Sequence, residues 1–294
     1  MMNNRFMHMR FILLLLLITQ SYSIDDQGSR GMVSGDIDNN GYPDILKWRF
    51  QEYDPIDSLL YQGGNQDYRR MPHHLLLNYG SHGFSTKIYL EEQNLPFLHS
   101  QGLIDVDLDG DLDIVAIEKE GDQQFYIFRN DGIDSDGNII LEEIFSYIQT
   151  DGSTSRTLAI ADFDNDGDQD VYIPRKYGIN WLFENQTLTG TFGDVQYNEN
   201  PDPLFTEVAL EKNVHDDSFV GLGSMGYGAA FGDYDNDNDN DLYLSNWGIN
   251  RLYRNDNGNF TDVTSIYNVY SDSLSNGASW GDFNNDGKLD LWAG

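Results

Sequence analysis

The chain has 294 residues, and its 49 aspartates and glutamates against 17 lysines and arginines give a formal net charge of −32. This balance excludes binding of nucleic acid or of an anionic membrane through a basic face, and the absence of cysteine excludes disulfides and thiolate metal sites. Hydrophobic residues make up 39% of the chain and aromatic residues 13%, so a folded core is nevertheless expected.

The N-terminal segment has the pattern of a secretory signal peptide. Two arginines without any acidic residue precede the apolar run 11–18, and small residues precede a cleavage point after Ser23. The run is far shorter than the roughly 20 apolar residues that a membrane-spanning helix needs. We therefore expect residues 1–23 to be removed on export, and residues 24–294 to form the mature chain with no membrane span.

A nine-residue acidic phrase then occurs five times, beginning at Asp36, Asp105, Asp162, Asp233 and Asp282. A second marker keeps step with it, an apolar run that ends in asparagine. This asparagine follows the first aspartate by 25, 23 and 22 residues in the second, third and fourth copies. In the first copy it follows by 42 residues, which predicts an inserted loop around residues 51–71. Two markers in phase indicate a structural repeat.

The acidic phrase has the composition of a loop that wraps a calcium ion. Calcium takes six to eight hard oxygens, and side chains at positions one, three, five and nine of a short loop can surround it. Position six needs a positive φ, which suits the glycine of four copies and Asn238 of the other. Aspartate, asparagine and glycine also favour metal-free turns, but a turn alone does not require several converging carboxylates. The sequence predicts up to five calcium ions, held by Asp36, Asp38, Asn40, Asp44, Asp105, Asp107, Asp109, Asp113, Asp162, Asp164, Asp166, Asp170, Asp233, Asp235, Asp237, Asp241, Asp282, Asn284, Asp286 and Asp290.

The charge of each loop predicts its affinity. Loops two, three and four offer four aspartates each, whereas Asn40 and Asn284 replace one aspartate in loops one and five. Ligand charge tunes calcium affinity, and Asn238 adds backbone strain to loop four. We therefore expect loops two and three to bind most tightly and loop five most weakly. We also expect the ions to stabilise the fold and to take no part in chemistry.

Short apolar runs of strand length flank each loop, whereas helices flank the loop of an EF-hand. The fourth repeat shows the whole unit, with strands expected at 226–232, 241–245, 250–254 and 259–263. Four antiparallel strands per repeat predict an all-β fold, a β-propeller whose calcium loops connect strands one and two of each blade. Small residues in strand one suit an innermost strand. Four complete blades and part of a fifth are visible.

Residues 228–237, 250–255 and 259–264 resemble the FG-GAP/VCBS repeat, and the resemblance covers residues 31–294. That repeat builds the calcium-bearing propeller of integrin α-subunits and of many exported bacterial proteins, and the phrasing is closest to the cartilage acidic protein type. The resemblance implies calcium at the five loops and a secreted, extracellular or periplasmic protein. It also implies a role in cell adhesion or in binding a protein or glycan ligand. Such propellers usually close with seven blades, so we expect the sequence to be truncated at its C-terminal end.

Catalytic residues are not expected. The sequence has no His-Glu-x-x-His zinc motif, and the identifiable carboxylates are committed to the loops. We therefore expect a non-enzymatic protein. A calcium-dependent polysaccharide lyase, or another carbohydrate-active propeller enzyme, is the alternative. Its basic candidates form no visible constellation in the sequence; they are Lys87, Arg175, Lys176 and Arg251.

Overall fold

The computed structural model describes nine segments of the chain, and the expected signal peptide and the expected insertion around residues 51–71 lie outside them. No helix within these segments has the length and hydropathy needed to cross a membrane. The described residues are 29–49, 74–88, 98–118, 123–135, 139–191, 194–198, 201–217, 225–269 and 275–294.

Four antiparallel sheets of four strands each follow one another along the chain, and within each sheet the strands pair in sequence order. The first sheet contains β1 (Ser29–Gly35), β2 (Asp44–Arg49), β3 (His74–Asn78) and β4 (Phe84–Ile88). The second contains β5 (Leu98–Ile104), β6 (Asp113–Glu118), β7 (Gln123–Ile133) and β8 (Ile139–Gln149). The third contains β10 (Ala159–Ala161), β11 (Asp170–Ile173), β13 (Trp181–Asn185) and β16 (Phe205–Glu207). The fourth contains β17 (Gly226–Gly232), β18 (Asp241–Asn246), β19 (Arg251–Asn255) and β20 (Phe260–Asp262).

Smaller elements complete the described fold. A final hairpin pairs β21 (Ala278–Gly281) with β22 (Asp290–Ala293). Two short ribbons belong to the third repeat and pair β9 (Thr154–Ser155) with β12 (Arg175–Lys176) and β14 (Leu188–Thr191) with β15 (Asp194–Tyr197). The helical turns are η1 (Gly80–His82) and α3 (Thr264–Tyr267). The expected all-β fold of four-stranded antiparallel units is confirmed, and the strands of the fourth repeat begin and end at or next to the expected residues.

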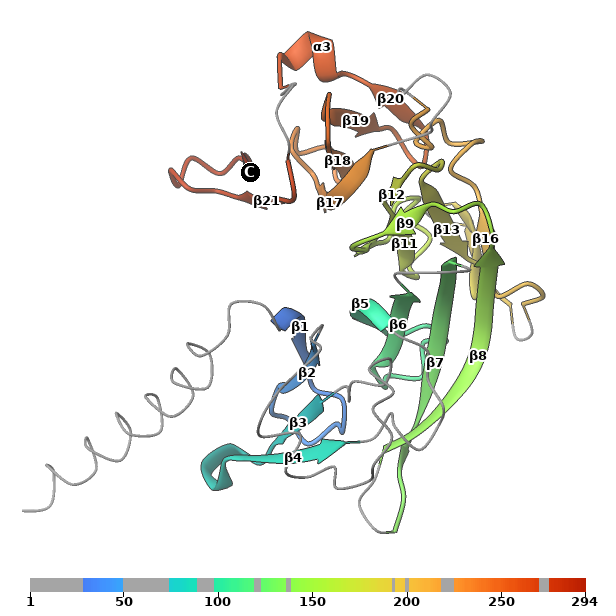
Figure 1. The fold of residues 1–294 in the computed structure, drawn as a ribbon, viewed down its shortest axis with the longest axis vertical. Helices are drawn as coiled ribbons and strands as arrows, with labels where there is room; N and C mark the ends of the chain where they lie inside the picture. The colour runs from blue at the N-terminus through green and yellow to red at the C-terminus, as the bar shows by residue number, and fades with distance from the viewer. Residues whose placement is uncertain are drawn as a thin grey trace, which may run out of the picture.

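The sheets follow one another as an open arc with the first strand of each sheet on its inner side (Figure 1). Contacts join β1 to β5, β5 to β10, β10 to β17 and β17 to β21. Inner strands approach so closely that a Cβ added at Gly228 would lie 2.8 Å from the carbonyl oxygen of Asn276. This crowding is the physical reason for the small residues expected in strand one.

The hydrophobic core lies between neighbouring sheets. One cluster joins the first two sheets and includes Leu46, Leu77, Ile114 and Phe128. The next joins the second and third sheets, where the rings of Phe125 and Phe183 stack with centroids 4.5 Å apart. A third cluster joins the third and fourth sheets through residues such as Tyr172, Leu182, Leu242 and Tyr253. Second strands such as β6 and β18 are therefore covered on both faces, and their central residues are a continuous apolar run rather than an alternating one.

Candidate metal centres in the hairpin loops

Each acidic phrase forms the loop between strands one and two of its sheet or hairpin. Position six has a positive φ in all five loops, as expected, with 74° at Asn238. Position four also has a positive φ, which the sequence analysis did not anticipate; its residues are Asn39, Leu108, Asn165, Asn236 and Asn285. The signal was present, because asparagine, which tolerates this conformation, occupies four of these five positions.

Three carboxylates converge in each of the first four loops, from positions one, three and nine. In each set, one oxygen per side chain lies within 4.8 Å of the others. Three hard oxygens at this separation are a set that a single divalent cation can bridge. The four sets are Asp36 with Asp38 and Asp44, Asp105 with Asp107 and Asp113, Asp162 with Asp164 and Asp170, and Asp233 with Asp235 and Asp241.

The residue at position five lies outside these four sets. One oxygen of Asp109 accepts a hydrogen bond of 2.9 Å from the backbone N–H of Asp111, two residues later. The same bond recurs in the other four loops, from the backbone N–H groups of Tyr42, Asp168, Asp239 and Lys288. A carboxylate has two oxygens, so this bond leaves one of them for a cation. In loops two to five, the aspartate at position five thus shapes the turn and keeps a ligand atom, whereas in loop one the single carbonyl oxygen of Asn40 accepts the bond.

The fifth loop has the same backbone hydrogen bonds with fewer acidic groups. The N–H of Gly287 donates to Asp282 at 2.8 Å, and the N–H of Phe283 donates to Asp290 at 3.0 Å. Asn284 stands at position three, so only two aspartates remain at positions one, three and nine. Asp282, Asn284 and Asp286 are exposed, unlike the corresponding residues of the third loop.

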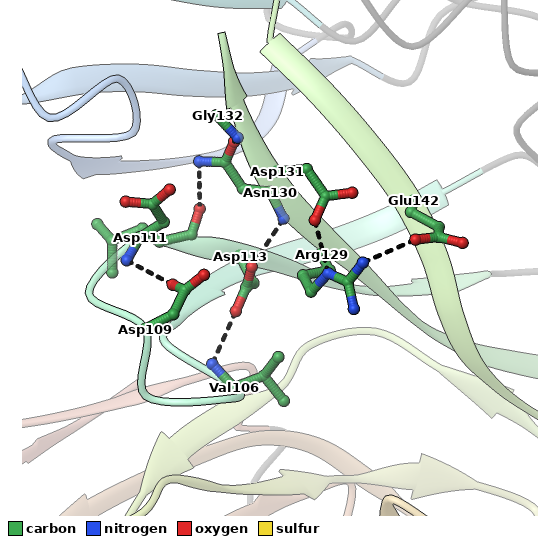
Figure 2. A network of polar contacts seen from close by, with 10 residues as sticks. Val106, Asp109, Asp111, Asp113, Arg129, Asn130, Asp131, Gly132 and Glu142 are labelled. Atoms are coloured by element: carbon green, nitrogen blue, oxygen red, sulfur yellow. Dashed lines mark hydrogen bonds and ion pairs between the residues drawn. The ribbon is translucent and has the colours of Figure 1, made fainter. Parts of the chain in front are cut away.

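The aspartate at position nine anchors each loop to its sheet. The side chain of Asp113 is fully buried and accepts backbone hydrogen bonds from Val106 at 2.7 Å and from Asn130 at 2.8 Å (Figure 2). Asp44, Asp170 and Asp241 are equally buried and accept the corresponding pair. Position nine therefore holds the loop closed whether or not a cation is bound.

The repeated asparagine, which lies at or near the end of strand three, joins loops two, three and four each to the preceding loop. The side-chain amide of Asn130 donates to the carbonyl oxygen of Ile37 at 2.8 Å, and that of Asn255 donates to Phe163 at 2.6 Å. Asn185 makes the same bond to Val106 at 3.1 Å. All three acceptors are at position two of the preceding loop. This second sequence marker therefore has a structural role, because it sets the spacing between successive loops.

A second link between loops runs from position four to position seven. Asn39 donates to Asp111, and Asn165 donates to Asp239. Between loops two and three this link is missing, because position four holds Leu108. The partner carboxylate, Asp168, is fully buried, and its Oδ1 has no hydrogen-bond partner among the described residues.

The converging carboxylates are held in an environment that disfavours their charge. Burial raises the pKa of Asp113, Asp164 and Asp241 to about 7, and raises that of Asp170 well above its ordinary value. Burial is also the first cause of the raised pKa of other ligands at positions one and three; these are Asp38, Asp105, Asp107, Asp162 and Asp235.

The hydrogen bonding of three ligand oxygens is a second observation that favours a bound cation. The Oδ1 atoms of Asp105, Asp107 and Asp162 are buried and accept no hydrogen bond within the part of the chain that the structure describes. A buried carboxylate oxygen without a partner is costly. A divalent cation bound between positions one, three and nine would give these oxygens a partner and remove the mutual repulsion. The residues present therefore fit a hard, oxygen-ligated metal ion.

Charges just before the repeated asparagine distinguish the loops. Arg129 is paired with Asp131 at 2.7 Å and Glu142 at 2.8 Å, and its charge opposes the rise in the pKa of Asp107 caused by burial and by Asp109. In the third repeat the corresponding residue is Glu184, whose charge adds to the rise in the pKa of Asp164. The surroundings of loop three are therefore more negative than those of loop two.

Most of the basic residues considered for a lyase form ion pairs or pack against other side chains. Arg175 is fully buried and pairs with Asp151 at 2.7 Å. Arg251 lies 3.7 Å from Asp216 and 3.5 Å from Asp262. The side chain of Lys87 lies outside the described part, and that of Lys176 packs on aromatic rings.

Residues 277–281 have the Gly-x-Ser-x-Gly spacing of a hydrolase nucleophile elbow. Such an elbow places its serine on a sharp turn between a strand and a helix. Ser279 instead lies within β21, and an acidic loop follows that strand. The spacing therefore does not form an elbow here.

Comparisons with known proteins agree with the repeat. A sequence profile described as the FG-GAP-like repeat matches residues 105–173 and 215–293, which together make up half of the chain. No curated protein matches the sequence significantly. Among solved structures, the chain is similar to an Agrocybe aegerita lectin described as recognising non-reducing terminal N-acetylglucosamine. The TM-score is 0.47, the identity is 18%, and the match covers 91% of this chain and 60% of the lectin.

Proposed function

Because the chain belongs to the FG-GAP-like repeat family, we propose that it is an exported, calcium-binding protein of the β-propeller type that binds an extracellular protein or glycan. The acidic loops bind up to five calcium ions, and the ions stabilise the sheets. Ligand binding takes place on surfaces that the stabilised sheets present. The protein is non-enzymatic.

One observation carries the calcium assignment. In loop two, oxygens of Asp105, Asp107 and Asp113 lie within 4.8 Å of one another, and two of these side chains have a buried oxygen that finds no hydrogen-bond partner among the described residues. Such a cluster is unfavourable without a cation. The same arrangement of positions one, three and nine recurs in four loops, which supports the same metal-binding role in each of them.

The choice of calcium rests on the number and kind of ligands. All available donors are oxygens, which disfavours zinc. Three converging carboxylates, together with the second carboxylate oxygen at position five of loops two to four, offer more oxygens than magnesium usually takes from protein. Magnesium needs strict octahedral geometry and retains several waters, whereas calcium accepts six to eight ligands in flexible geometry.

A stabilising rather than catalytic role is supported by the closure of each loop. The buried aspartate at position nine receives two backbone N–H groups, so the loop encloses its own ligands. A catalytic metal keeps an open position for substrate or water. The engagement of Arg175 and Arg251 in ion pairs also leaves a lyase fewer free basic groups.

Calcium titration of the mature chain by calorimetry, together with thermal unfolding in calcium and in chelator, tests the metal assignment. Five ions would change the formal charge of the full sequence from −32 to −22, a gain of ten charges that the mature chain shares, and binding to the folded state raises its stability by mass action. Asp107→Ala should abolish one site, whereas the control Glu211→Gln, at an exposed acidic residue outside the loops, should retain all sites. Absence of binding heat and an unchanged unfolding midpoint would refute the assignment.

Two further measurements test the remaining parts of the proposal. N-terminal sequencing of the protein recovered outside the producing cell should begin after Ser23. Calcium-loaded protein applied to arrays of glycans and extracellular proteins should bind a restricted set, and chelator should weaken that binding by loosening the sheets. Retention inside the cell contradicts export, and failure to bind either array contradicts the ligand-binding role.

A further inference from the structure

A cluster of aromatic and basic side chains lies at the strand ends opposite the acidic loops. Lys176 and Tyr177 follow the far end of β11, and Trp247 follows the far end of β18 in the next sheet. Tyr227 lies near the start of β17, whose other end leads into loop four. An isolated bridge pairs Lys176 with Met225, and the N–H of Trp247 donates to the carbonyl of Met225 at 3.0 Å.

These contacts bring parts of the third and fourth sheets together, and β12 lies beside β17 (Figure 1). We call Lys176, Tyr177, Tyr227 and Trp247 the aromatic shelf. It belongs to neither repeat alone, because the third repeat contributes Lys176 and Tyr177 and the fourth contributes Tyr227 and Trp247. The shelf is distinct from the metal loops, which occupy the other ends of the same strands.

The ammonium group of Lys176 is held among three rings. Its Nζ lies 4.1 Å from the ring centroid of Trp247, 4.6 Å from that of Tyr177 and 5.6 Å from that of Tyr227. The rings of Tyr227 and Trp247 stack with centroids 4.8 Å apart and an interplanar angle of 9°. The guanidinium of Arg156 lies 5.0 Å from the ring centroid of Tyr227. The rings therefore fix the ammonium in place.

The charge of Lys176 is not neutralised by a neighbouring carboxylate. Arg129, Arg175, Arg251 and Arg254 each lie within 4.0 Å of an aspartate or glutamate oxygen. No such carboxylate lies near Lys176 among the described residues. In a chain with a net charge of −32, an ammonium held by aromatic rings and tyrosine hydroxyls, without a carboxylate partner among the described residues, is a local site for an anion.

We propose that the aromatic shelf binds an acidic sugar, with the carboxylate of a uronate on Lys176 and the pyranose face on the exposed ring of Tyr177. Tyr177 is 49% exposed and Trp247 is partly exposed, so flat apolar surface lies directly beside the fixed charge. This proposal rests on the proposed ligand-binding function and names its ligand class. It also gathers Lys176, a basic residue without a visible partner in the sequence, into a site.

A sugar fits this surface better than an acidic peptide does. Flat rings beside a single ammonium match a pyranose that carries one carboxylate per unit. An acidic peptide presents closely spaced carboxylates along its length and needs several cations, whereas the shelf offers a single ammonium beside flat rings. Binding of an acidic peptide in place of a uronate is therefore an outcome that would overturn the proposal.

The test is a titration of the calcium-loaded mature chain, followed by tryptophan fluorescence and calorimetry. The probes are a galacturonate oligosaccharide, the neutral galactose oligosaccharide of the same length, and a short glutamate peptide. We expect the uronate to bind and the other two not to bind. Lys176→Met and Trp247→Ala should each weaken uronate binding at least about tenfold.

Lys212→Met is the matched control, because Lys212 also lies against a ring, 5.3 Å from the centroid of Phe163, but outside the shelf. It should bind the uronate like the unchanged chain. Unfolding midpoints and calcium titrations check that each variant is folded, and Lys176→Gln provides a second variant. If Lys176→Met and Lys176→Gln both leave uronate binding unchanged, the proposed role of the shelf is refuted, whereas the ligand-binding function is not. Failure of every glycan and protein on the arrays refutes the ligand-binding function itself.

Discussion

The side-chain amide of Asn165 donates a hydrogen bond of 2.6 Å to the carboxylate of Asp239, on the next acidic loop along the chain. Asn39 and Asp111 repeat this relationship between the first two loops. Between loops two and three, Leu108 replaces the donor, and a buried oxygen of Asp168 has no hydrogen-bond partner in the described part of the chain. One side chain therefore deprives this junction of a link that its two neighbours have.

Leu108→Asn should stabilise the chain. Leu108 has a φ of 61° and is 40% exposed, so leucine is strained there and little packing is lost on its removal. Asparagine tolerates this conformation and supplies the missing donor to Asp168. We expect the free energy of unfolding to rise by about 1–2 kcal/mol, measured by denaturant unfolding in calcium.

The Asp168→Ala background separates the two contributions. There, Leu108→Asn retains only the benefit of relieved backbone strain, so its gain should be smaller. An equal gain in both backgrounds would show that no bond to Asp168 forms. A loss of stability would contradict the whole account of this junction.

Substitutions at position nine and at position five should differ in how much they destabilise the chain when calcium is removed. Asp113 is buried and accepts two backbone N–H groups, whereas Asp109 is exposed and accepts one within its own turn. In chelator, Asp113→Ala should lower the free energy of unfolding by about 2–4 kcal/mol, because two buried donors lose their acceptor. Asp109→Ala should lower it by less than about 1 kcal/mol. In calcium, both variants should lose the ion of loop two; equal losses in chelator would contradict the anchoring role of Asp113.

Loop three should bind calcium more tightly than loop two, which refines the equal ranking expected from their ligands. Glu184 adds negative charge beside Asp164, whereas Arg129 adds positive charge near Asp107. Glu184→Gln should weaken loop three and Arg129→Gln should strengthen loop two, each by about three- to tenfold at low salt. Site-resolved titration, read from backbone amide shifts at Gly167 and Gly110, measures each loop separately. If both variants kept their calcium affinities, neighbouring charge would not be the cause of the difference between the two loops.

The metal-free chain should become more stable as the pH falls from 8 to 5. Burial raises the pKa of Asp113, Asp164 and Asp241 to about 7 in the folded chain, above the ordinary value of 3.8. Their protonated forms therefore favour folding, and this contribution is lost as the pH rises through 7. Calcium binds the deprotonated forms, so the stabilisation by calcium should shrink over the same fall in pH.

Unfolding midpoints from pH 8 to 5, in chelator and in calcium, measure both trends. Asp113→Asn should flatten the slope of the chelated chain, since it removes one of the titrating groups. A midpoint of the chelated chain that falls steadily on acidification would contradict the raised pKa values.

The sequence by itself determined the repeat, the loops and the strands. Positions one, three, five and nine are separated by a few residues, so local turn geometry brings their side chains to one side of a loop. The glycine or asparagine at position six already specifies the positive φ seen at Gly167 and Asn238. Apolar runs on both sides are enough to place strands such as β17 and β18.

Only the tertiary structure decided what the repeated asparagine and Lys176 contact. The acceptor of Asn130 lies 93 residues away and that of Asn255 lies 92 residues away, each on the preceding loop. Lys176 meets Trp247 for the same reason, because both lie where two sheets pack against each other. The relative position of the sheets is set by side chains that interlock between them, such as Tyr172 and Leu242. No spacing along the chain encodes that interlocking, since it depends on the shapes of many side chains at once.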